Sequence, residues 1–349
     1  MDLERRLALV KRNTQEILVE SELEELLGTR KHPVAYFGLA ITGRLHIGYY
    51  IPIVKISDFL RAGFRFKILF ADIHGHLDDQ KTPFDLLDLR MEYYMEAIRG
   101  MLESIGVDAS RLEFVKGRDF ELDPSYTLDM YRLAASFTFN RCRRAASEVV
   151  RFGEEPKLSG FIYPILQALD EEYLDVDAQY GGHDQRKIMA FAREALPKLG
   201  YSPRVEVMSP MLPGLTGEKM SASREESKID LLDTEEEVSH KMSQAFCPAG
   251  EVEGNGVLTF ARYVTMILKH DQREGLRVDR PERYGGDITY RTIAELERDF
   301  SDGELHPQDL KTSLARETSQ MLEPVRKRLE AKMDQVKQAY PDPPGTSHR

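Results

Sequence analysis

Two short segments of the chain combine glycine with residues that bind phosphate. The first, Thr42-Gly-Arg-Leu-His46-Ile-Gly48, joins a predicted buried strand to a predicted helix. A helix N-terminus offers free N–H groups to phosphate oxygens, and an imidazole there can donate one more hydrogen bond. Gly43 permits a tight turn, and Gly48 lets a flat group approach the backbone. A helix-start histidine beside a packing glycine gives the same pattern, so this segment alone leaves both interpretations open.

The second segment is Gly217-Glu-Lys219-Met220-Ser221-Ala222-Ser223, in a proline- and glycine-rich loop. Its lysine supplies a mobile positive charge, its serines keep the loop polar, and its glycine allows movement. Such a loop is suited to clamping a triphosphate. An ordinary solvated lysine loop is the alternative, but a five-residue string of this kind is far rarer by chance than a His-x-Gly triplet.

A third group of polar residues shares one face of a predicted helix. Tyr163, Gln167 and Asp170 are spaced i, i+4 and i+7, which places them side by side. Two more acids follow Asp170, and such a run more often marks an exposed helix face. Tyr36 lies on the strand that enters the first segment. Taken by themselves, both tyrosines are more often core aromatics than ligands.

The elements around these residues alternate between strand and helix. The pattern predicts strands over 34–38, 66–71 and 176–180 and helices over 45–60, 83–105, 161–173 and 184–196. This order and spacing indicate parallel βαβ units, and hence an α/β fold with a doubly wound, Rossmann-type parallel sheet. Residues 1–30 read as amphipathic helix, and residues 112–156 read as a helical insertion between the two halves of the sheet.

Beyond residue 231 the pattern changes to helices alone, at 234–246, 257–269, 293–300 and 307–337. A chain of 349 residues suits about two domains. We therefore predict a Rossmann-type catalytic domain over 1–230, a helical domain over 231–340 and a flexible tail over 341–349. The catalytic domain would hold the insertion at about 112–156 and the lysine loop at 217–224.

Composition excludes several classes of protein. The chain carries 48 basic and 59 acidic side chains, a net charge of −11, which argues against coating nucleic acid through a uniformly positive surface. Its two cysteines form neither a disulfide framework nor a metal cluster. No signal peptide and no bilayer-spanning run is evident. We expect a soluble cytoplasmic enzyme without a bound metal ion.

Taken together, the two glycine-containing segments resemble the paired signatures of class I aminoacyl-tRNA synthetases. Tyr36, the helix face at 163–170, the turn at 181–187 and the strand end at 71–74 together resemble the tyrosyl-tRNA synthetases of archaeal and eukaryotic type. This similarity extends over nearly the whole chain, from residue 11 to residue 328. The resemblance implies activation of L-tyrosine with ATP to tyrosyl-adenylate and pyrophosphate, then transfer to the 3′ end of tRNA(Tyr). It also implies a homodimer formed through the insertion, an anticodon-binding role for the C-terminal helices, and Mg²⁺ that accompanies ATP.

By position, the resemblance also implies the site residues. For tyrosine these are Tyr36, Ala71, His74, Tyr163, Gln167, Asp170 and Gln185. For ATP and the adenylate they are Gly38, Gly43, His46, Gly48, Gly182, Asp184, Lys219 and Met220, and Ser221 and Ser223 join His46, Gly48 and Lys219 in the catalytic set. For tRNA they are Arg186, His306 and Asp309. Within the tyrosine set, Tyr36 and Asp170 would hold the phenolic hydroxyl, and Tyr163, Gln167 and Gln185 would hold the amino group.

The sequence departs from the family pattern at two positions. Tyr49 stands where the first signature usually has a second histidine, and Ala222 stands where the second usually has a lysine. A phenol can donate a hydrogen bond to phosphate but cannot become a cation, so more of the phosphate binding falls to His46. Lys219 is then the one cation of the second string.

Three alternatives remain at this point. Tryptophanyl-tRNA synthetases share the fold and both signatures, but a tyrosine paired with a carboxylate suits a phenol, which both donates and accepts, better than an indole, which only donates. A small-molecule nucleotidyltransferase would not need the lysine loop or the helical domain. A catalytically silent, RNA-binding relative would not need an intact pocket.

Two local segments are basic despite the acidic total. Residues 140–151 hold four arginines and one glutamate, and residues 324–337 hold five cations and two acids, so each segment has a charge of +3. Such segments can bind one folded RNA locally on an otherwise repelling surface. A solvated helix face is the alternative for each.

Overall fold

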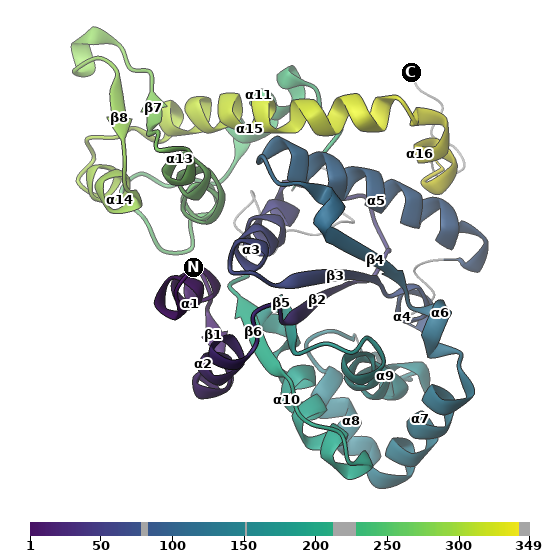
Figure 1. The fold of residues 1–349 in the computed structure, drawn as a ribbon. Helices are drawn as coiled ribbons and strands as arrows, with labels where there is room; N and C mark the ends of the chain where they lie inside the picture. The colour runs from purple at the N-terminus through teal and green to yellow at the C-terminus, as the bar shows by residue number, and fades with distance from the viewer. Residues whose placement is uncertain (78–82, 151, 212–227, 342–349) are drawn as a thin grey trace. The chain divides into compact units, whose positions relative to one another are not determined.

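The computed structural model describes residues 1–77, 83–150, 152–211 and 228–341 (Figure 1). The chain divides into two compact units. The first unit holds residues 1–42, 55–92 and 109–211, and the second holds 43–54, 93–108 and the residues from 212 onward. Two helices, α3 (Tyr50–Arg61) and α5 (Leu87–Ser104), run from one unit into the other along the chain.

A six-stranded sheet forms the centre of the first unit. Its strands are β1 (Glu16–Ile17), β2 (Val34–Leu39), β3 (Arg65–Phe70), β4 (Leu112–Lys116), β5 (Ala178–Gly182) and β6 (Val205–Ser209). They lie in the order β1-β6-β5-β2-β3-β4, and all neighbours are parallel except β1 and β6. The predicted α/β class with a doubly wound parallel sheet is confirmed.

The helices of the first unit include the one that carries Asp170 and those that pack around it. They are α1 (Leu3–Lys11), α2 (Glu20–Thr29), α4 (Asp72–Leu77), α6 (Arg118–Glu121), α7 (Pro124–Ser136), α8 (Phe139–Ala146), α9 (Ser159–Tyr173) and α10 (Arg186–Ala195). Figure 1 shows α9 and α10 side by side on one face of the sheet. Buried side chains from α7 to α10, among them Leu133, Phe161 and Phe191, form one hydrophobic cluster. This cluster fixes the rotation of α9, and with it the direction of Asp170.

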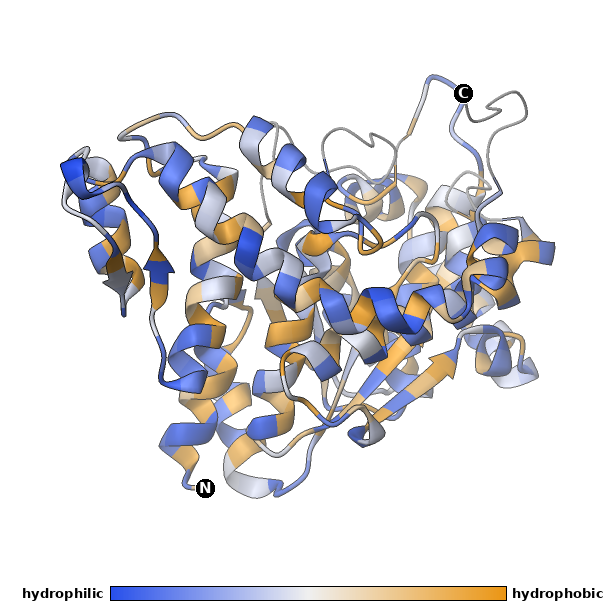
Figure 2. Ribbon diagram, turned by 90° about the horizontal axis from the view of Figure 1, so that it is seen from above, coloured by the Kyte–Doolittle hydropathy of each residue, from blue (hydrophilic) through white to orange (hydrophobic). Residues whose placement is uncertain are grey.

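Helices dominate the second unit. Their bounds are α11 (Glu235–Gln244), α12 (Gly256–Phe260), α13 (Met266–Gln272), α14 (Ile293–Ser301), α15 (Pro307–Glu330) and α16 (Met333–Ala339). A capping box begins α11, where Thr234 and Glu237 exchange hydrogen bonds. Figure 2 shows hydrophobic and hydrophilic residues alternating along these helices, as amphipathic helices require.

The structure corrects four sequence predictions. Residues 1–30 are two helices separated by strand β1, and the predicted insertion begins with β4, an edge strand of the sheet, so only its part after residue 117 is helical. Strand β6 was not predicted. The prediction of helices alone beyond residue 231 was wrong as well, because β7 (Leu276–Val278) and β8 (Ile288–Tyr290) form an antiparallel hairpin. The lysine loop at 217–224 and tail residues 342–349 lie outside the described residues.

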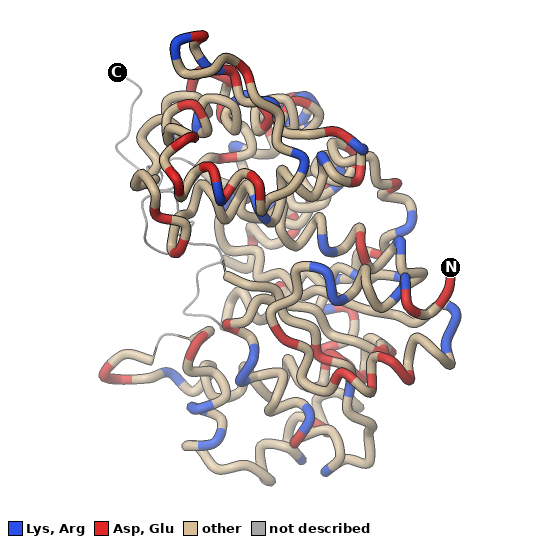
Figure 3. Tube along the Cα trace, turned by 90° about the vertical axis from the view of Figure 1, so that its left-hand side faces the viewer, with Lys and Arg blue, Asp and Glu red and all other residues tan. Residues whose placement is uncertain are grey.

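None of the helices within the described ranges has the length and apolar character needed to cross a bilayer. Basic and acidic residues are interspersed along the trace in Figure 3. Many of the cations form ion pairs with neighbouring acids, as Arg328 and Lys332 do with Glu96. The +3 charge of residues 324–337 is therefore partly neutralised within the second unit.

Candidate active site

Three of the residues predicted for tyrosine, among them the phenol pair Tyr36 and Asp170, lie in the interior of the first unit. Tyr36 is the third residue of β2, His74 lies in α4 directly after β3, and Asp170 lies near the end of α9. All three are 1% exposed. Asp170 is therefore not on an exposed helix face, despite the acids that follow it. Its Oδ1 atom accepts a hydrogen bond of 2.8 Å from the hydroxyl of Tyr126, which comes from α7.

The hydroxyl of Tyr36 is buried and has no hydrogen-bond partner among the described residues. Burial, together with the negative charges of Glu171 and Asp170, raises the pKa of Tyr36 well above its ordinary value, so its hydroxyl stays protonated and can donate. A buried polar group without a partner is costly and needs a ligand to complete it. A hydroxyl donor beside a carboxylate acceptor fits a ligand hydroxyl that both accepts and donates.

An acid missed by the sequence analysis lies beside this pair. Glu121, in α6, places its Oε1 atom 3.5 Å from His74 Nδ1, and His74 Nε2 lies 3.7 Å from Asp170 Oδ2. Burial by itself lowers the pKa of His74, but the two carboxylates outweigh it and raise this pKa to about 9. His74 is thus an imidazolium between two carboxyl groups at neutral pH. The arrangement also explains Gly117, since a Cβ atom there would lie only 2.2 Å from Glu121 Oε1.

The same group is the one place, among the described residues, where three His, Asp or Glu side chains offer donor atoms within 4.8 Å of one another. An imidazolium between two carboxylates already supplies the positive charge that a metal ion would bring. Burial and the neighbouring Glu121 raise the pKa of Asp170, while His74 opposes that rise. The cluster therefore places one positive charge between two buried carboxyl groups, one of which is that of Asp170.

Replacing Glu121 by glutamine is expected to change how stability depends on pH. A histidine whose pKa rises from 6.5 unfolded to about 9 folded stabilises the protein fully below pH 6.5, and this contribution, about 3 kcal/mol, is lost as pH rises through 9. Without the Glu121 charge the folded pKa falls, so the free energy of unfolding should decline less between pH 6 and 9.5 in Glu121→Gln than in the unaltered protein. Urea denaturation at several pH values measures this. Glu194→Gln, which removes an exposed partner of Arg141, is the matched control, and parallel curves for Glu121→Gln and the unaltered protein would contradict the assignment.

The polar residues predicted for the amino group form a second cluster in the first unit. The side-chain amide of Gln167, on α9, donates to Gln185 Oε1 at 3.2 Å. Gln185 ends a short 3-10 turn, η4 (His183–Gln185), which follows β5. Tyr163, one turn before Gln167, packs edge-on against the ring of His74 with 4.8 Å between ring centroids. The i, i+4, i+7 face predicted from the sequence is therefore realised on α9.

Glycines lie where the parallel strands β2 and β5 end. Gly38 is exposed near the end of β2, and Gly182 is the last residue of β5. A Cβ atom at Gly182 would lie 2.7 Å from Asp184 Oδ1, so a side chain there would displace that carboxylate. Ala71 follows β3 and is buried. Ligands of doubly wound sheets bind outside these carboxyl ends, so Gly38 and Gly182 lie at the edge of the sheet where such ligands bind.

From Gly43 onward, the first signature segment belongs to the second unit. His46 precedes a 3-10 turn, η1 (Ile47–Tyr49), and its Nδ1 atom accepts the N–H of Gly48 at 3.2 Å. Burial, and next the positive charge of Lys228, lower the pKa of His46 to about 4. A neutral imidazole that accepts at Nδ1 carries its proton on Nε2, so Nε2 is left as a donor for an anion. The Tyr49 ring packs edge-on against His46, with 5.0 Å between centroids.

The backbone just before His46 is held at two points. The carbonyl of Gly43 accepts hydrogen bonds from the hydroxyls of Tyr94, at 2.7 Å, and Tyr340, at 3.1 Å. The N–H of Leu45 donates to the hydroxyl of Tyr93 at 3.0 Å. Lys219, Met220, Ser221 and Ser223 lie outside the described residues, so their predicted roles remain predictions.

The residues predicted for tRNA lie far apart in the chain. Arg186, at the start of α10, makes a two-point ion pair with Glu16, at 2.7 and 2.8 Å. His306 is exposed and caps α15, where its Nδ1 atom accepts the N–H of Gln308, and Asp309 follows in the first turn. The sequence signals for these residues were positional only, and nothing in the sequence pointed to Tyr126 or Glu121.

Comparisons with known proteins agree with this geometry. The family described as "tRNA synthetases class I (W and Y)" matches residues 29–323. The chain is 50% identical to the tyrosine–tRNA ligase of Haloarcula marismortui, over 98% of this chain and 99% of that protein. It is 49% identical to the cytoplasmic tyrosine–tRNA ligase of Danio rerio, over 96% of this chain and 63% of that longer protein.

A similar solved structure is the tyrosyl-tRNA synthetase of Archaeoglobus fulgidus complexed with L-tyrosine. It is 41% identical, with a TM-score of 0.87, and the match covers 94% of this chain and all of that one. Tryptophanyl-tRNA synthetase from Aeropyrum pernix aligns with a TM-score of 0.74 at 15% identity, which shows the fold alone. With its sheet, its two polar clusters and these matches, this chain belongs to the class I tRNA synthetases of the tryptophan and tyrosine family.

Proposed function

We propose that the chain is a tyrosine–tRNA ligase, which joins L-tyrosine to ATP as tyrosyl-adenylate and then transfers tyrosine to the 3′ end of tRNA(Tyr). The observation that carries the proposal is the buried, unpartnered hydroxyl of Tyr36 in the interior that also holds the Asp170 carboxylate. Relatives about 50% identical over nearly the full chain are named tyrosine–tRNA ligases, which supports the same substrate.

The phenol pair explains why tyrosine is preferred to its competitors. The substrate hydroxyl would donate to Asp170 and accept from Tyr36. Phenylalanine would leave the Tyr36 hydroxyl buried without a partner and would offer no donor to Asp170, and indole could satisfy only the acceptor. Tyrosyl-tRNA synthetases are themselves a well-known case of such discrimination by hydrogen bonding. The tryptophan alternative therefore requires a different partner for the Tyr36 hydroxyl.

The remaining pocket residues would bind and orient the reacting groups. Tyr163, Gln167 and Gln185 would hold the substrate amino group, which leaves its carboxylate free to react. Gly182 and Asp184 would contact the ribose of the adenylate, where only a glycine leaves space beside Asp184. Ala71 and Gly38 would line the strand ends between these sites.

Activation requires positioning rather than a general base. The tyrosine carboxylate is already ionised at neutral pH and attacks the α-phosphorus, while the bond to pyrophosphate breaks. The Nε2–H of His46 would donate to a phosphate oxygen, and Lys219 with Met220, Ser221 and Ser223 would hold the leaving phosphates. Mg²⁺ would accompany ATP, held mostly by phosphate and water. In the second step a ribose hydroxyl of tRNA attacks the adenylate carbonyl, and AMP leaves.

Binding of tRNA, which is a polyanion, requires local positive surfaces on this acidic protein. On α8 the side chains of Arg143 and Arg144 are exposed, whereas Arg141 is paired with Glu194. We assign Arg186 to the acceptor end of tRNA, and His306 and Asp309, in the helical domain over 231–340, to the anticodon. Residues 1–230 would form the catalytic domain, in the cytoplasm as for the relatives named cytoplasmic.

A homodimer is proposed from the exposed surface of residues 122–158. Five of the eleven large hydrophobic side chains that are exposed in the described ranges lie there, namely Leu122, Leu128, Tyr131, Phe139 and Leu158. Leu128 and Tyr131 are three residues apart on α7, so they share one face of that helix. Exposed apolar groups of this kind mark association surfaces.

A double substitution of Leu128 and Tyr131 by glutamate is expected to separate the dimer, because it places two charges where the partner would exclude water. The dissociation constant should rise at least about a hundredfold. Sedimentation velocity measures the shift from dimer to monomer. Tyr284→Glu, at an equally exposed tyrosine of the second unit, should leave the dimer intact. An unchanged sedimentation coefficient in the double variant would place the interface elsewhere.

The function is tested by pyrophosphate exchange and tRNA charging with three amino acids. We expect exchange and charging with tyrosine, and at most traces with tryptophan or phenylalanine. A preference for tryptophan would indicate a tryptophan–tRNA ligase instead. Absence of ATP turnover with every amino acid would favour the silent RNA-binding relative.

A further inference from the structure

Residues 228–231 lie against the segment that contains His46. The N–H of Ile47 donates to the carbonyl of Ile229 at 3.0 Å, and the N–H of Leu231 lies 3.4 Å from the carbonyl of Leu45. His46 and Asp230 are thereby paired as an isolated antiparallel bridge. Backbone hydrogen bonds to residues 229–231 thus hold residues 45–47, although neither segment belongs to a strand of the two sheets.

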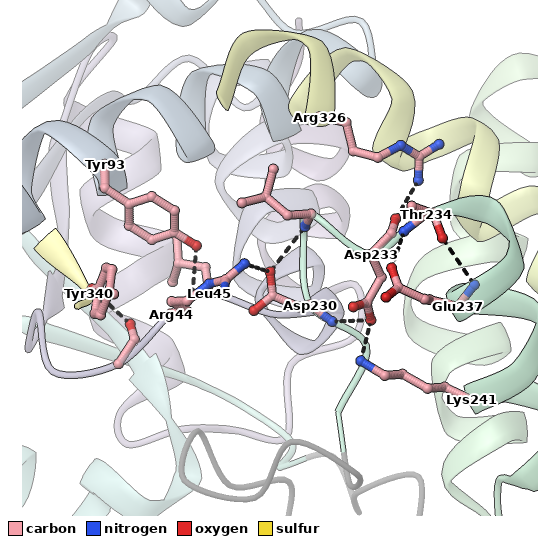
Figure 4. Close-up of polar contacts among 12 residues, drawn as sticks. Arg44, Leu45, Tyr93, Asp230, Asp233, Thr234, Glu237, Lys241, Arg326 and Tyr340 are labelled. Atoms are coloured by element: carbon pink, nitrogen blue, oxygen red, sulfur yellow. Dashed lines mark hydrogen bonds and ion pairs between the residues drawn. The ribbon is translucent and has the colours of Figure 1, made fainter. Parts of the chain in front are cut away.

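Asp230 adds a side-chain contact to this backbone pairing. Its Oδ1 atom lies 2.7 Å from Arg44 Nη2, and it also accepts the N–H of Leu232 at 3.0 Å. The Asp230 carboxylate is largely buried, and Arg44 is about one third exposed. Figure 4 shows these contacts converging on Asp230 from both segments. A charge-assisted hydrogen bond of this length is among the stronger local contacts that a loop can have.

The turn that carries Asp230 is in turn held by two helices. The N–H of Asp230 donates to Asp233 Oδ2 at 2.8 Å, and the same oxygen accepts from Lys241, on α11, at 2.6 Å. Arg326, on α15, donates to the carbonyl of Asp233 at 3.0 Å. Figure 4 shows this series of contacts from Arg326 through Asp233 to Asp230. The segment that contains His46 is therefore connected, through Asp230 and Asp233, to helices α11 and α15.

We propose that Asp230 is a positioning residue for the activation step, which fixes the His46 loop by pairing with Arg44 and with the backbone beside His46. The inference rests on the proposed function, because it assumes that this loop receives ATP. Asp230 would not touch ATP itself, since its carboxylate is engaged by Arg44 and Leu232 and would repel phosphate. Its effect passes through the placement of the His46 Nε2–H donor.

The experiment measures pyrophosphate exchange at varied ATP and varied tyrosine for Asp230→Asn, Arg44→Gln and the double variant. Asparagine keeps an acceptor for Leu232 but removes the charge that Arg44 meets. Each single variant should raise the KM for ATP about tenfold, the size of one charge-assisted hydrogen bond, with the KM for tyrosine unchanged within twofold. The double variant should be no worse than the worse single variant, because both substitutions remove one interaction. Arg44→Lys, which keeps the charge, should recover part of the loss.

A matched control is available in the same unit. Arg262 and Glu297 form an ion pair of the same kind, 2.6 Å long, between η7 (Ala261–Thr265) and α14. Glu297→Gln should leave the KM for ATP unchanged. Thermal unfolding and equilibrium binding of tyrosine, measured on every variant, separate a local loss of positioning from loss of the fold.

Three results would overturn the inference. They are an unchanged KM for ATP in both single variants, fully additive losses in the double variant, and equal increases in the KM values for ATP and tyrosine. His46→Ala distinguishes these from a failure of the proposed function. If His46→Ala impairs the use of ATP and Asp230→Asn does not, only the inference about Asp230 fails. If His46→Ala has no effect, the role proposed for the whole loop fails.

Discussion

Asp170→Asn is expected to abolish tyrosine activation, with kcat/KM for tyrosine falling about 10³-fold in pyrophosphate exchange. The carboxylate is 1% exposed, accepts from Tyr126 and faces the imidazolium of His74. Asparagine keeps an oxygen acceptor but removes the charge, so the hydrogen bond to the substrate phenol weakens and His74 is left with Glu121 as its nearest counter-charge. Truncating one partner of a buried, hydrogen-bonded charged contact between two binding partners costs about 2 to 5 kcal/mol, and about 4 kcal/mol corresponds to a 10³-fold change in kcat/KM.

The affinity for ATP should change little in the same variant, because the contacts of Asp170 among the described residues are with Tyr126 and His74, neither of which is assigned to phosphate. Asp175→Asn is the matched control, since Asp175 lies five residues later, is exposed and has a backbone conformation that asparagine also tolerates. Retention of tyrosine activation within threefold in Asp170→Asn would remove this residue from the phenol site.

His46→Ala is the variant with the second largest expected effect. The loss of one donor to a transferring phosphate should lower kcat/KM for ATP about 10²-fold and leave equilibrium binding of tyrosine unchanged. His270→Ala, at an exposed histidine of the same unit, is the control. A loss of tyrosine binding that equals the loss of ATP use would indicate a structural role for His46 instead.

The acidity of His46 sets the pH dependence of the same step. Its folded pKa of about 4 lies below the ordinary 6.5, so the neutral, Nε2-protonated form prevails from pH 6 to pH 8, and His46 should contribute no titration to activity there. As pH falls toward 4, protonation of Nδ1 breaks the hydrogen bond from Gly48 and activity should fall. The free energy of unfolding should also fall as pH falls from 6.5 to 4, because the unfolded chain binds a proton at His46 in this range and the folded protein does not.

The main elements of the sheet could be predicted because their signals are local. Strand β2 is an apolar run, β3 ends in the apolar residues 68–70, and α9 repeats its buried residues at helical spacing. Strand β6 is fully buried, but it contains the acid Glu206. This residue interrupts the apolar run from which a buried strand would be predicted. Strand β4 is an edge strand in which no residue is fully buried, and β7 and β8 have three residues each. Such short or partly exposed strands depend on their neighbours for stability, which no local pattern records.

Some residues of the candidate site could likewise be predicted from the sequence, and others could not. The spacing of Tyr163, Gln167 and Asp170 predicted a shared helix face, but the burial of Asp170 depends on α4, α6 and α7 closing over α9, so the run of acids after it was misleading. Glu121 and Tyr126 became visible only when the tertiary structure brought α6 and α7 to that residue. The basic segment 324–337 shows the converse, because ion pairs with Glu96 and Glu103 absorb charges that the sequence presents as free.

A crystal structure of the protein with bound L-tyrosine tests the central claim most directly. We expect the phenolic oxygen to lie within hydrogen-bond distance of both Asp170 and the Tyr36 hydroxyl, with the amino group beside Tyr163, Gln167 and Gln185. A phenolic oxygen directed to any other part of the protein, with the Tyr36 hydroxyl still unpartnered, would contradict it.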